Sequence, residues 1–175
     1  MSKRHLTLPL TDPVIDTLHA GDAVLLTGTL LVARDAAHAR LAAALAAGEP
    51  LPVSVVGETV YYMGPSPARE GRVIGSAGPT TSTRMDKYTP GLLQRGLKAM
   101  IGKGRRSPAV IEAMKTHHAV YFAAVGGCGA LLSRCVTAAE TVCYPDLDPE
   151  AVRRITVRDL PCIVAIDCRG ENLYR

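Results

Sequence analysis

Apolar stretches of strand length recur along the chain, separated by glycine, proline and polar residues. The stretch 23–33, AVLLTGTLLVA, is long, apolar and β-branched enough for a buried strand, with Gly28 at a bulge or a close approach of another segment. The stretch 118–127, HAVYFAAVGG, predicts a second buried strand on the same grounds. Further strands are expected at 5–10, around 139–144 and in the strand and turn at 161–174.

Two segments have clear helical patterns. The alanine-rich stretch 36–48 predicts a helix that Asp35 caps and that stops at a glycine. A second helix is expected over 107–117, because Ser107 suits the N-cap and a proline stands at the first helical position. Shorter helices are expected within 11–19, 128–136 and 148–154.

Two further regions complete the pattern. The segment 85–104 is expected to be helical in two pieces, broken by Pro90 and Gly91, and the region 50–78 reads as short strands and turns. The second half of the chain thus alternates helix and strand, whereas the middle is mostly strand. We therefore predict one mixed α/β domain with three layers, spanning residues 1–175.

The composition narrows the choice of partner. Hydrophobic residues make up 47 % and charged residues 21 % of the chain, which indicates neither disorder nor a fibrous structure. Only 4 % of residues are aromatic, so base-stacking surfaces for single-stranded nucleic acid are poorly supplied. The formal net charge of +4 favours anionic partners, yet no lysine or arginine block has the length of a nucleic-acid-binding tail. We therefore expect an anionic partner other than a nucleic acid.

The apolar runs bear on the cellular compartment, and the cysteine spacing bears on disulfides and metal sites. No apolar run reaches the roughly 18 residues of a membrane span, and residues 1–13 lack the apolar core of a signal peptide, so we expect a cytoplasmic protein that binds no membrane. The five cysteines are odd in number and include no C-x-x-C pair. A disulfide framework, or a complete metal or iron–sulfur site held by this chain alone, is therefore not expected.

The densest group of candidate functional side chains is GPTTSTRMD, residues 78–86. Gly78 and Pro79 predict a bend after a strand. The hydroxyl residues that follow lead toward a helix, where N–H and O–H groups that point outward together would form an anion pocket. Arg84 adds a planar guanidinium that can hold a carboxylate through two parallel hydrogen bonds. The alternative is an ordinary helix start with a solvated Arg84. Composition leaves both interpretations open.

Other candidates stand near the ends of predicted strands. Arg34 follows the first long strand, where ligands bind in α/β folds, and is either a second carboxylate clamp or a solvated residue. His38 lies four residues on, and a surface helix histidine is the favoured interpretation. Lys103, between two glycines in MIGKGRRS, is either a ligand-binding cation or part of a solvated basic turn. A Walker A loop is excluded, because Gly104 stands where Ser or Thr should follow the lysine.

The segment VGGCGALL follows the second buried strand. Leu132 stands where a dinucleotide fingerprint has its third glycine, so we interpret the segment as a tight connection between a strand and a helix. Cys128 within it is expected to be a small buried residue rather than a nucleophile.

Three segments, GTLLVARDAAHAR, GPTTSTRMDKYTPGLLQRGLKAMIGKGRRS and HAVYFAAVGGCGALLSRCV, together resemble the β subunit, or C-terminal domain, of class I iron–sulfur fumarases and tartrate dehydratases. The likeness is collinear from about Leu6 to Tyr174. It implies a three-layer β/β/α swivelling domain with a mixed sheet, in a hydro-lyase that adds water to fumarate or removes it from malate or tartrate. It also implies an α subunit that carries a [4Fe–4S] cluster on three cysteines, so that this chain does not ligate the cluster. A hetero-oligomer of the α2β2 kind is expected.

The resemblance also assigns residues. It places substrate-binding cations on Arg34, Arg84 and Lys103, and a proposed catalytic threonine, which has an acidic partner from the α subunit, on Thr80. Hydroxyls are poor bases, so Thr80 is expected to act only where cations favour its anion, or as a proton relay. Arg84 and Lys103 are also expected to be catalytic, because they would stabilise charge that grows beside the substrate carboxylate. Fumarate, tartrate and a methylated relative are not distinguished.

A function of a different class also fits these cations. In a stand-alone module, the same arginine and lysine side chains would hold a phosphate or a nucleic acid, with steep salt dependence. A third possibility is an orphan β subunit with a structural or regulatory role. The hydro-lyase requires an α subunit and gains activity on mixing, whereas the module binds anions by itself.

Overall fold

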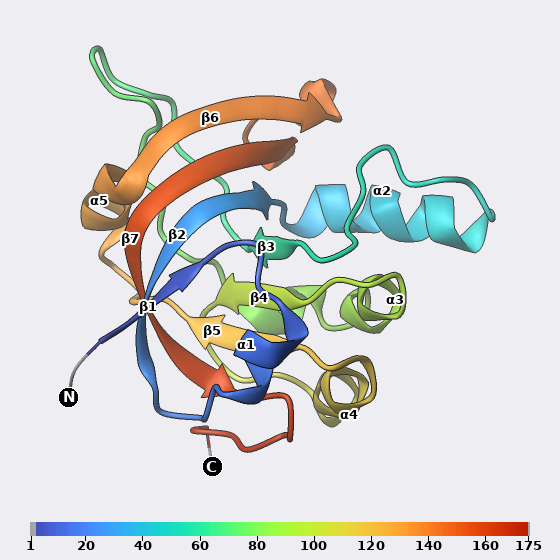
Figure 1. Ribbon diagram of the computed structural model, residues 1–175. Coiled ribbons are helices and arrows are strands. Elements are labelled where there is room, and N and C mark those ends of the chain that lie inside the picture. Colours follow the sequence, from blue (N-terminus) through green and yellow to red (C-terminus); the bar gives the residue numbers. More distant parts are fainter. Residues whose placement is uncertain (1–2, 175) are drawn as a thin grey trace.

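A computed structural model describes residues 3–174 (Figure 1). The strands are β1 (Arg4–Thr7), β2 (Ala23–Val32), β3 (Thr59–Tyr61), β4 (Ala99–Gly102), β5 (Val120–Ala123), β6 (Val136–Cys143) and β7 (Val152–Ile166). The α-helices are α1 (Asp12–Asp16), α2 (Asp35–Ala46), α3 (Thr89–Gln94), α4 (Pro108–His117) and α5 (Gly129–Leu132). Three 3-10 helices are η1 (Ser82–Met85), η2 (Ser133–Cys135) and η3 (Pro145–Glu150). No helix within the described range is long and apolar enough to cross a membrane.

The strands form one mixed sheet in the order β1-β2-β3-β4-β5-β7-β6. The pairings from β1 through β5 are parallel, whereas β7 runs antiparallel to each of its partners. β7 has 15 residues and also pairs with β2, so β2, β3, β4, β5 and β7 close a ring of pairings (Figure 1). The predicted α/β class with a mixed sheet is confirmed.

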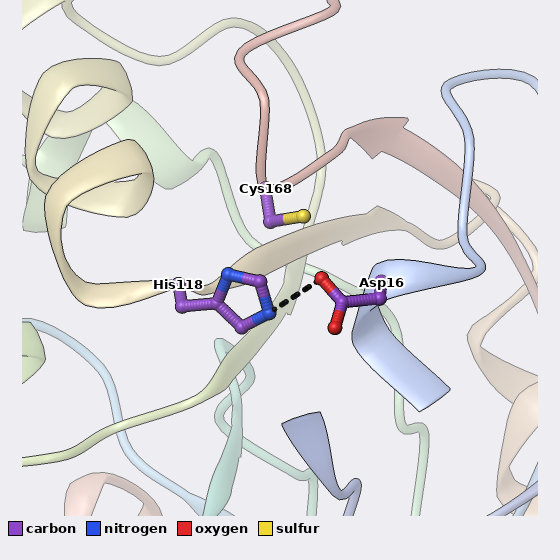
Figure 2. A group of neighbouring side chains, drawn as sticks. All are labelled: Asp16, His118 and Cys168. Atoms are coloured by element: carbon purple, nitrogen blue, oxygen red, sulfur yellow. Dashed lines mark ion pairs between the residues drawn. The ribbon is translucent and has the colours of Figure 1, made fainter. Parts of the chain in front are cut away.

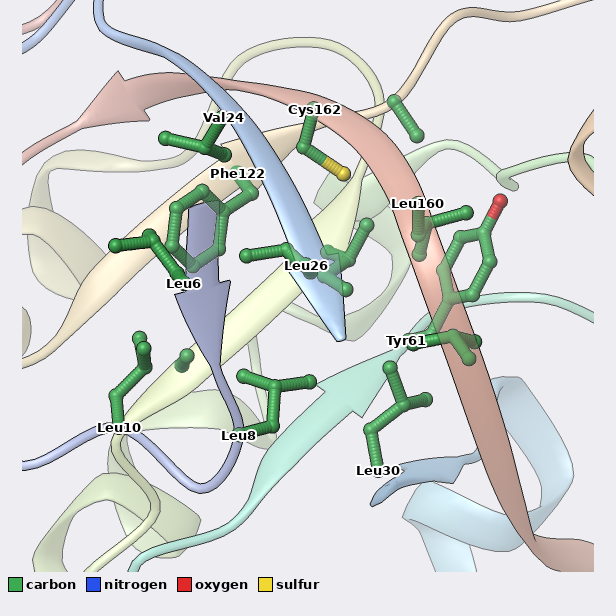
Figure 3. Close-up of a cluster of buried hydrophobic side chains, with 14 of the residues drawn as sticks. Leu6, Leu8, Leu10, Val24, Leu26, Leu30, Tyr61, Phe122, Leu160 and Cys162 are labelled. Atoms are coloured by element: carbon green, nitrogen blue, oxygen red, sulfur yellow. The ribbon is translucent and has the colours of Figure 1, made fainter. Parts of the chain in front are cut away.

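Alternating side chains along the strands supply two hydrophobic cores. Successive residues of a strand point to opposite faces, so in β5 Phe122 enters the core inside the ring while Tyr121 enters the core under the helices. Figure 3 shows the inner core, where Leu6, Val24 and Leu26 lie beside Phe122. Helices α2, α3 and α4 cover the outer core (Figure 1). The layers are therefore sheet, sheet and helix.

Gly28 fills the role that the sequence predicts. Its φ is +134°, and the register of β2 against β7 shifts between Leu26 and Gly28. A Cβ atom at this position would lie 2.6 Å from the carbonyl oxygen of Leu8. Only glycine allows both the backbone conformation and the close approach of the segment after β1.

Three predicted elements are wrong. Region 50–78 contains only the short β3 and is otherwise irregular, because its glycines and prolines break strands as well as join them. The second helical piece of 85–104 is the buried strand β4, since a short apolar run has no period that separates strand from helix. The predicted helix 148–154 is instead the end of η3 and the start of β7. Pro90 stands in the first turn of α3, where it begins the helix.

Candidate functional site

The predicted site residues meet at the edge of the sheet where the parallel strands end. β2 leads to Arg34 at the N-cap of α2, and β4 leads directly to Lys103. The carboxyl ends of strands in α/β sheets are where loops present side chains to ligands. Segment 78–86 crosses the same edge and brings Thr80 and Arg84 to it. Asp35, predicted as the cap, lies in the first turn of α2 instead.

Backbone hydrogen bonds fix segment 78–86 against two strand ends. The N–H of Thr80 donates to the Tyr62 carbonyl at 2.8 Å, and the N–H of Ser82 donates to the Lys103 carbonyl at 3.0 Å. These amides are used within the fold, and the segment continues into the four-residue η1 rather than an α-helix. Two of the amides that an anion pocket would need are therefore used within the fold, and the segment presents side chains at this edge.

Arg84 is oriented by a carboxylate of the same chain. Its Nε donates to Asp35 Oδ1 at 2.8 Å, and its Nη2 lies 2.7 Å from Asp35 Oδ2. Its Nη1 donates to Thr80 Oγ1 at 3.3 Å. A guanidinium carries five N–H donors, so this pairing leaves donors for a ligand on a side chain that is 49 % exposed. The structure thus brings Thr80 and Arg84 into contact.

Arg34 is held in a similar way by Glu150 at the end of η3. Its Nη2 lies 2.9 Å from Glu150 Oε1, while Glu150 Oε2 accepts the N–H of Ala36 at 2.7 Å. The Nε of Arg34 is buried and has no hydrogen-bond partner among residues 3–174. A Cβ atom at Gly64 would lie 2.7 Å from this Nε, so the glycine provides the space that the guanidinium occupies.

Lys103 is the mobile cation of this group. Its side chain is exposed, and within the described part of the chain no hydrogen bond or ion pair holds its ammonium. The stem runs beside the loop after β5, where a Cβ at Gly126 would lie 3.4 Å from Lys103 Cδ and 3.9 Å from Nζ. A glycine at 126 therefore leaves the lysine free to move along this loop.

Two carboxylates stand beside the predicted cations in space: Asp35, which the sequence indicated only as a helix cap, and Glu150, which it did not indicate. The five charged groups, Arg34, Arg84, Lys103, Asp35 and Glu150, leave a net charge of +1 at this edge. A carboxylate that pairs with an arginine restricts its rotamers and so prepares it for a second anion. Neither of the two surface hollows that segment 65–76 borders contains any of the four predicted residues.

A buried ion pair connects the segments that carry Arg84 and Lys103. The side chain of Arg106 is fully buried, and its Nε donates to Asp86 Oδ1 at 2.7 Å. Asp86 Oδ2 accepts the N–H of Ser107 at 2.6 Å. Because Asp86 lies two residues after Arg84, and Arg106 three residues after Lys103, this pair fixes both segments relative to each other.

The remaining contacts of Arg106 explain its burial. Its Nη2 donates to Thr89 Oγ1 at 2.8 Å, and its guanidinium carbon lies 5.2 Å and 5.0 Å from the ring centres of Tyr62 and Tyr121. Such stacking suits arginine better than lysine. The sequence carries no signal that separates Arg106 from its neighbour Arg105 in the basic turn.

His38 is completely buried, which corrects the expected surface position. Its Nδ1 lies 2.9 Å from the Arg34 carbonyl oxygen, and its ring packs at 5.3 Å from that of Tyr62. Burial lowers the pKa of His38 to about 4, although the hydrogen bond to Arg34 acts in the opposite direction. The ring is therefore neutral at pH 7, and Nδ1–H is the donor to the carbonyl.

This histidine makes the fold sensitive to acid. Its folded pKa lies below the unfolded value of about 6.5, so the unfolded state takes up the proton first and stability falls as pH drops from 6.5 toward 4. Between pH 7 and pH 5, we expect His38 to account for about 2 kcal/mol of lost unfolding free energy. Urea titrations at pH 7 and pH 5 measure this difference in unfolding free energy. His38→Asn, whose amide can donate to the same carbonyl, should remove this loss, whereas His5→Asn on the surface should retain it.

The cysteines bear on which cofactor this chain can hold. All five cysteines are unpaired, and Cys128 is half-buried before α5. Among the residues that the structure describes, one group of at least three His, Cys, Asp and Glu side chains has convergent ligand atoms, and it contains a single cysteine. Iron–sulfur clusters are held by several thiolates. The described residues therefore do not fit a [4Fe–4S] cluster.

Comparison with known families identifies the domain. The model of the family described as "Fumarase C-terminus" matches residues 2–175. The chain therefore belongs to the Fumarase C-terminus family, in agreement with the resemblance found in the sequence.

Curated relatives carry hydro-lyase names. The chain is 40 % identical over 157 residues to "Fumarate hydratase 2" of Leishmania major and 40 % identical over 152 residues to "Fumarate hydratase class I, aerobic" of Escherichia coli strain K12. These matches cover 88 % and 86 % of the chain but only 28 % of each relative. A Methanocaldococcus jannaschii protein named for L(+)-tartrate dehydratase subunit beta is 34 % identical, over 94 % of the chain and 88 % of that protein. The chain thus spans about a quarter of the fumarate hydratases and nearly all of the tartrate dehydratase relative.

Proposed function

We propose that the chain is the β subunit of a two-subunit iron–sulfur hydro-lyase that converts fumarate and water to L-malate. The observation that carries the proposal is that Arg34, Arg84 and Lys103 lie at the same edge of the sheet, with Arg84 in contact with the Thr80 hydroxyl, in a chain of this family. Two carboxylate-paired arginines and a mobile lysine suit a small dianion. The carboxylates of Asp35 and Glu150 lower the net positive charge at this edge. A substrate carboxylate must therefore make well-oriented hydrogen bonds to the arginines to bind beside them.

Each cation has its own part in this proposal. Arg34 and Arg84 bind the substrate carboxylates through the guanidinium donors that their internal partners leave free. Lys103 approaches from the loop side, and its ammonium stabilises the negative charge that develops next to a carboxylate when the carbon-bound proton moves. The guanidinium of Arg84 is proposed to stabilise the same developing charge. Arg84 and Lys103 therefore contribute to the reaction rate as well as to substrate binding.

Thr80 is proposed to move the proton. Its Oγ1 accepts a hydrogen bond from Arg84 Nη1 at 3.3 Å, which leaves its own O–H directed elsewhere. Forming an alkoxide at neutral pH requires a large free energy. Transfer of the proton through the hydroxyl to an acid of the partner subunit requires less. The guanidinium beside Oγ1 favours whatever negative charge collects there.

The cofactor and partner belong to the same proposal. Because the described residues do not fit a [4Fe–4S] cluster, we place the cluster on an α subunit that docks against this sheet edge. An α2β2-like assembly and a cytoplasmic location are part of this proposal. The beta-subunit name of the Methanocaldococcus jannaschii relative supports the two-chain arrangement.

Tartrate is the alternative substrate, and the same relative favours it. Both substrates are C4 dicarboxylates, so the arginine pair would serve either. A substrate panel of L-malate, L(+)-tartrate and a methylated malate, assayed with one enzyme preparation, separates them by kcat/KM.

Anaerobic reconstitution tests the proposal. The chain is mixed with a candidate α subunit carrying its cluster, and fumarate absorbance is followed. Activity that requires both chains supports the proposal. A stable complex without hydro-lyase activity on any dicarboxylate of the panel would overturn it. Tight binding of phosphate or an oligonucleotide by the chain alone, weakening steeply with salt, would favour the anion-binding module instead.

The space beside Arg34 gives a sharp prediction for the reconstituted enzyme. Gly64→Ala places a methyl group against the buried Nε and should displace the guanidinium, lowering kcat/KM by about 10- to 100-fold. Steady-state kinetics measure the effect. Gly91→Ala in α3 is the matched control, because its new Cβ would meet only Leu45 at an ordinary 3.7 Å. Equal kinetics for the two variants would contradict this role of Gly64.

A further inference from the structure

A second group of functional side chains lies at the opposite end of the parallel strands. Asp16 ends α1, His118 is the C-cap of α4 just before β5, and Cys168 follows β7 by two residues. In Figure 2 the Cys168 sulfur lies beside the gap between the His118 ring and the Asp16 carboxylate. Three segments distant in sequence therefore meet here, away from Arg34 and Lys103 at the carboxyl ends of β2 and β4.

The distances suit a single ion. His118 Nε2 lies 3.1 Å from Asp16 Oδ1, and one ligand atom from each of the three side chains lies within 4.8 Å of the others. Zinc bonds of about 2.0–2.3 Å put tetrahedral ligand atoms about 3.5 Å apart. The nitrogen and oxygen are close to that separation, and the sulfur has to approach by at most about 1.3 Å, which a small side-chain rotation supplies.

Neighbouring hydrogen bonds hold these segments in place. Arg169 Nη1 donates to the backbone carbonyl of Asp16 at 3.1 Å, and its Nη2 lies 3.1 Å from the fully buried carboxylate of Asp167. The same Nη1 lies 4.0 Å from the Cys168 sulfur; burial raises the pKa of this thiol, and the charge of Arg169 opposes that rise in part. The ligand positions are thus fixed by groups that are not ligands themselves, as a preorganised site requires.

Exposure leaves one side of the group open. Cys168 is buried, whereas the side chains of His118 and Asp16 are 34 % and 63 % exposed. An ion bound by all three would retain a position toward solvent for water, as in three-ligand zinc sites. A thiolate and a carboxylate would also balance the two charges of a divalent cation.

We propose that Asp16, His118 and Cys168 form a binding site for a divalent transition metal of the zinc type. The nitrogen, oxygen and sulfur donors fit Zn²⁺ or Co²⁺, whereas Mg²⁺ and Ca²⁺ prefer oxygen ligands alone. The bound ion joins α1, the end of α4 and the segment after β7, and so stabilises the folded chain. This site is independent of the proposed hydro-lyase function.

Titration of the purified full chain with Co²⁺ tests the site. A cobalt–thiolate absorption band that Zn²⁺ abolishes by competition is expected, together with a rise in Tm on addition of Zn²⁺. Cys168→Ser should remove the band, and Cys143→Ser, a half-buried cysteine in β6, should retain it. Asp16→Asn, at an exposed side chain, should fold normally and weaken Co²⁺ binding by at least about 10-fold.

The outcomes are decisive without any activity measurement. Absence of the band in the unmodified chain would overturn the proposal, as would a band that survives Cys168→Ser. If Cys168→Ser does not fold, unchanged Co²⁺ affinity in both Asp16→Asn and His118→Asn would overturn it. Asparagine is chosen at 118 because it tolerates the positive φ of 55° there.

Discussion

Replacing Lys103 by methionine is expected to lower kcat/KM of the reconstituted hydro-lyase by about 100- to 1000-fold, the range found when one preorganised electrostatic group is removed. Methionine retains much of the stem and removes the ammonium, so binding and transition-state stabilisation are lost together. The lysine has no ion pair in the described chain, so the free energy of unfolding should change by less than about 0.5 kcal/mol. Steady-state kinetics and urea titration measure the two quantities.

The matched control for this variant is Lys115→Met. Lys115 is exposed on α4, and its one ion pair among residues 3–174 is with Glu112, one turn away. It should leave both kinetics and stability nearly unchanged. Equal activity of the Lys103 and Lys115 variants would remove Lys103 from the site and would leave the arginines to be tested separately.

Removal of the buried guanidinium of Arg106 is expected to have the largest effect on stability. In Arg106→Met, the Asp86 carboxylate, only 11 % exposed, keeps its backbone donor but loses its charge partner. Breaking a buried ion pair in this way costs about 3–5 kcal/mol. Denaturant unfolding of the isolated chain measures it. Because the pair fixes the segments that carry Arg84 and Lys103, activity after reconstitution should fall too.

A double variant separates charge from packing. Adding Asp86→Asn to Arg106→Met removes the unpaired charge while an amide oxygen can still accept the Ser107 N–H, so about 1–3 kcal/mol should return. Arg40→Ala, which breaks the exposed pair with Asp146, is the surface control and should leave the stability nearly unchanged. A double variant as unstable as the single one would attribute the loss to packing of the aliphatic stem and ring contacts.

The sequence predicted those elements whose patterns are local. The alanine-rich α2 and the Ser-Pro start of α4 depend on propensity and capping, and β2 and β5 are long or apolar enough to stand out. β4 was missed because four buried residues between glycine-rich turns have no diagnostic period. The length of β7 was missed because its exposed and buried positions follow three different partner strands.

The candidate site also contains residues that the sequence indicated and residues that only the folded chain brings together. Types and spacing along the chain suggested Arg34, Arg84 and Lys103, and the family resemblance added Thr80; the fold brings all four to one edge. Glu150 was not foreseen, because a carboxylate 116 positions away from its arginine has no sequence signal. His38 was expected on the surface of its helix, whereas contacts with Tyr62 and the Arg34 carbonyl bury it.

The ring of strands also determines the order in which the chain can complete its fold. β2 is paired with β7 from Ala23 opposite Ile163 to Val32 opposite Arg153. During synthesis at about 5–20 residues per second, that edge of β2 has no partner for on the order of 10 s. An unpaired apolar strand edge is a site of aggregation. The edge of β2 that faces β7 is therefore open to pairing with another chain until residues 152–166 have been synthesised.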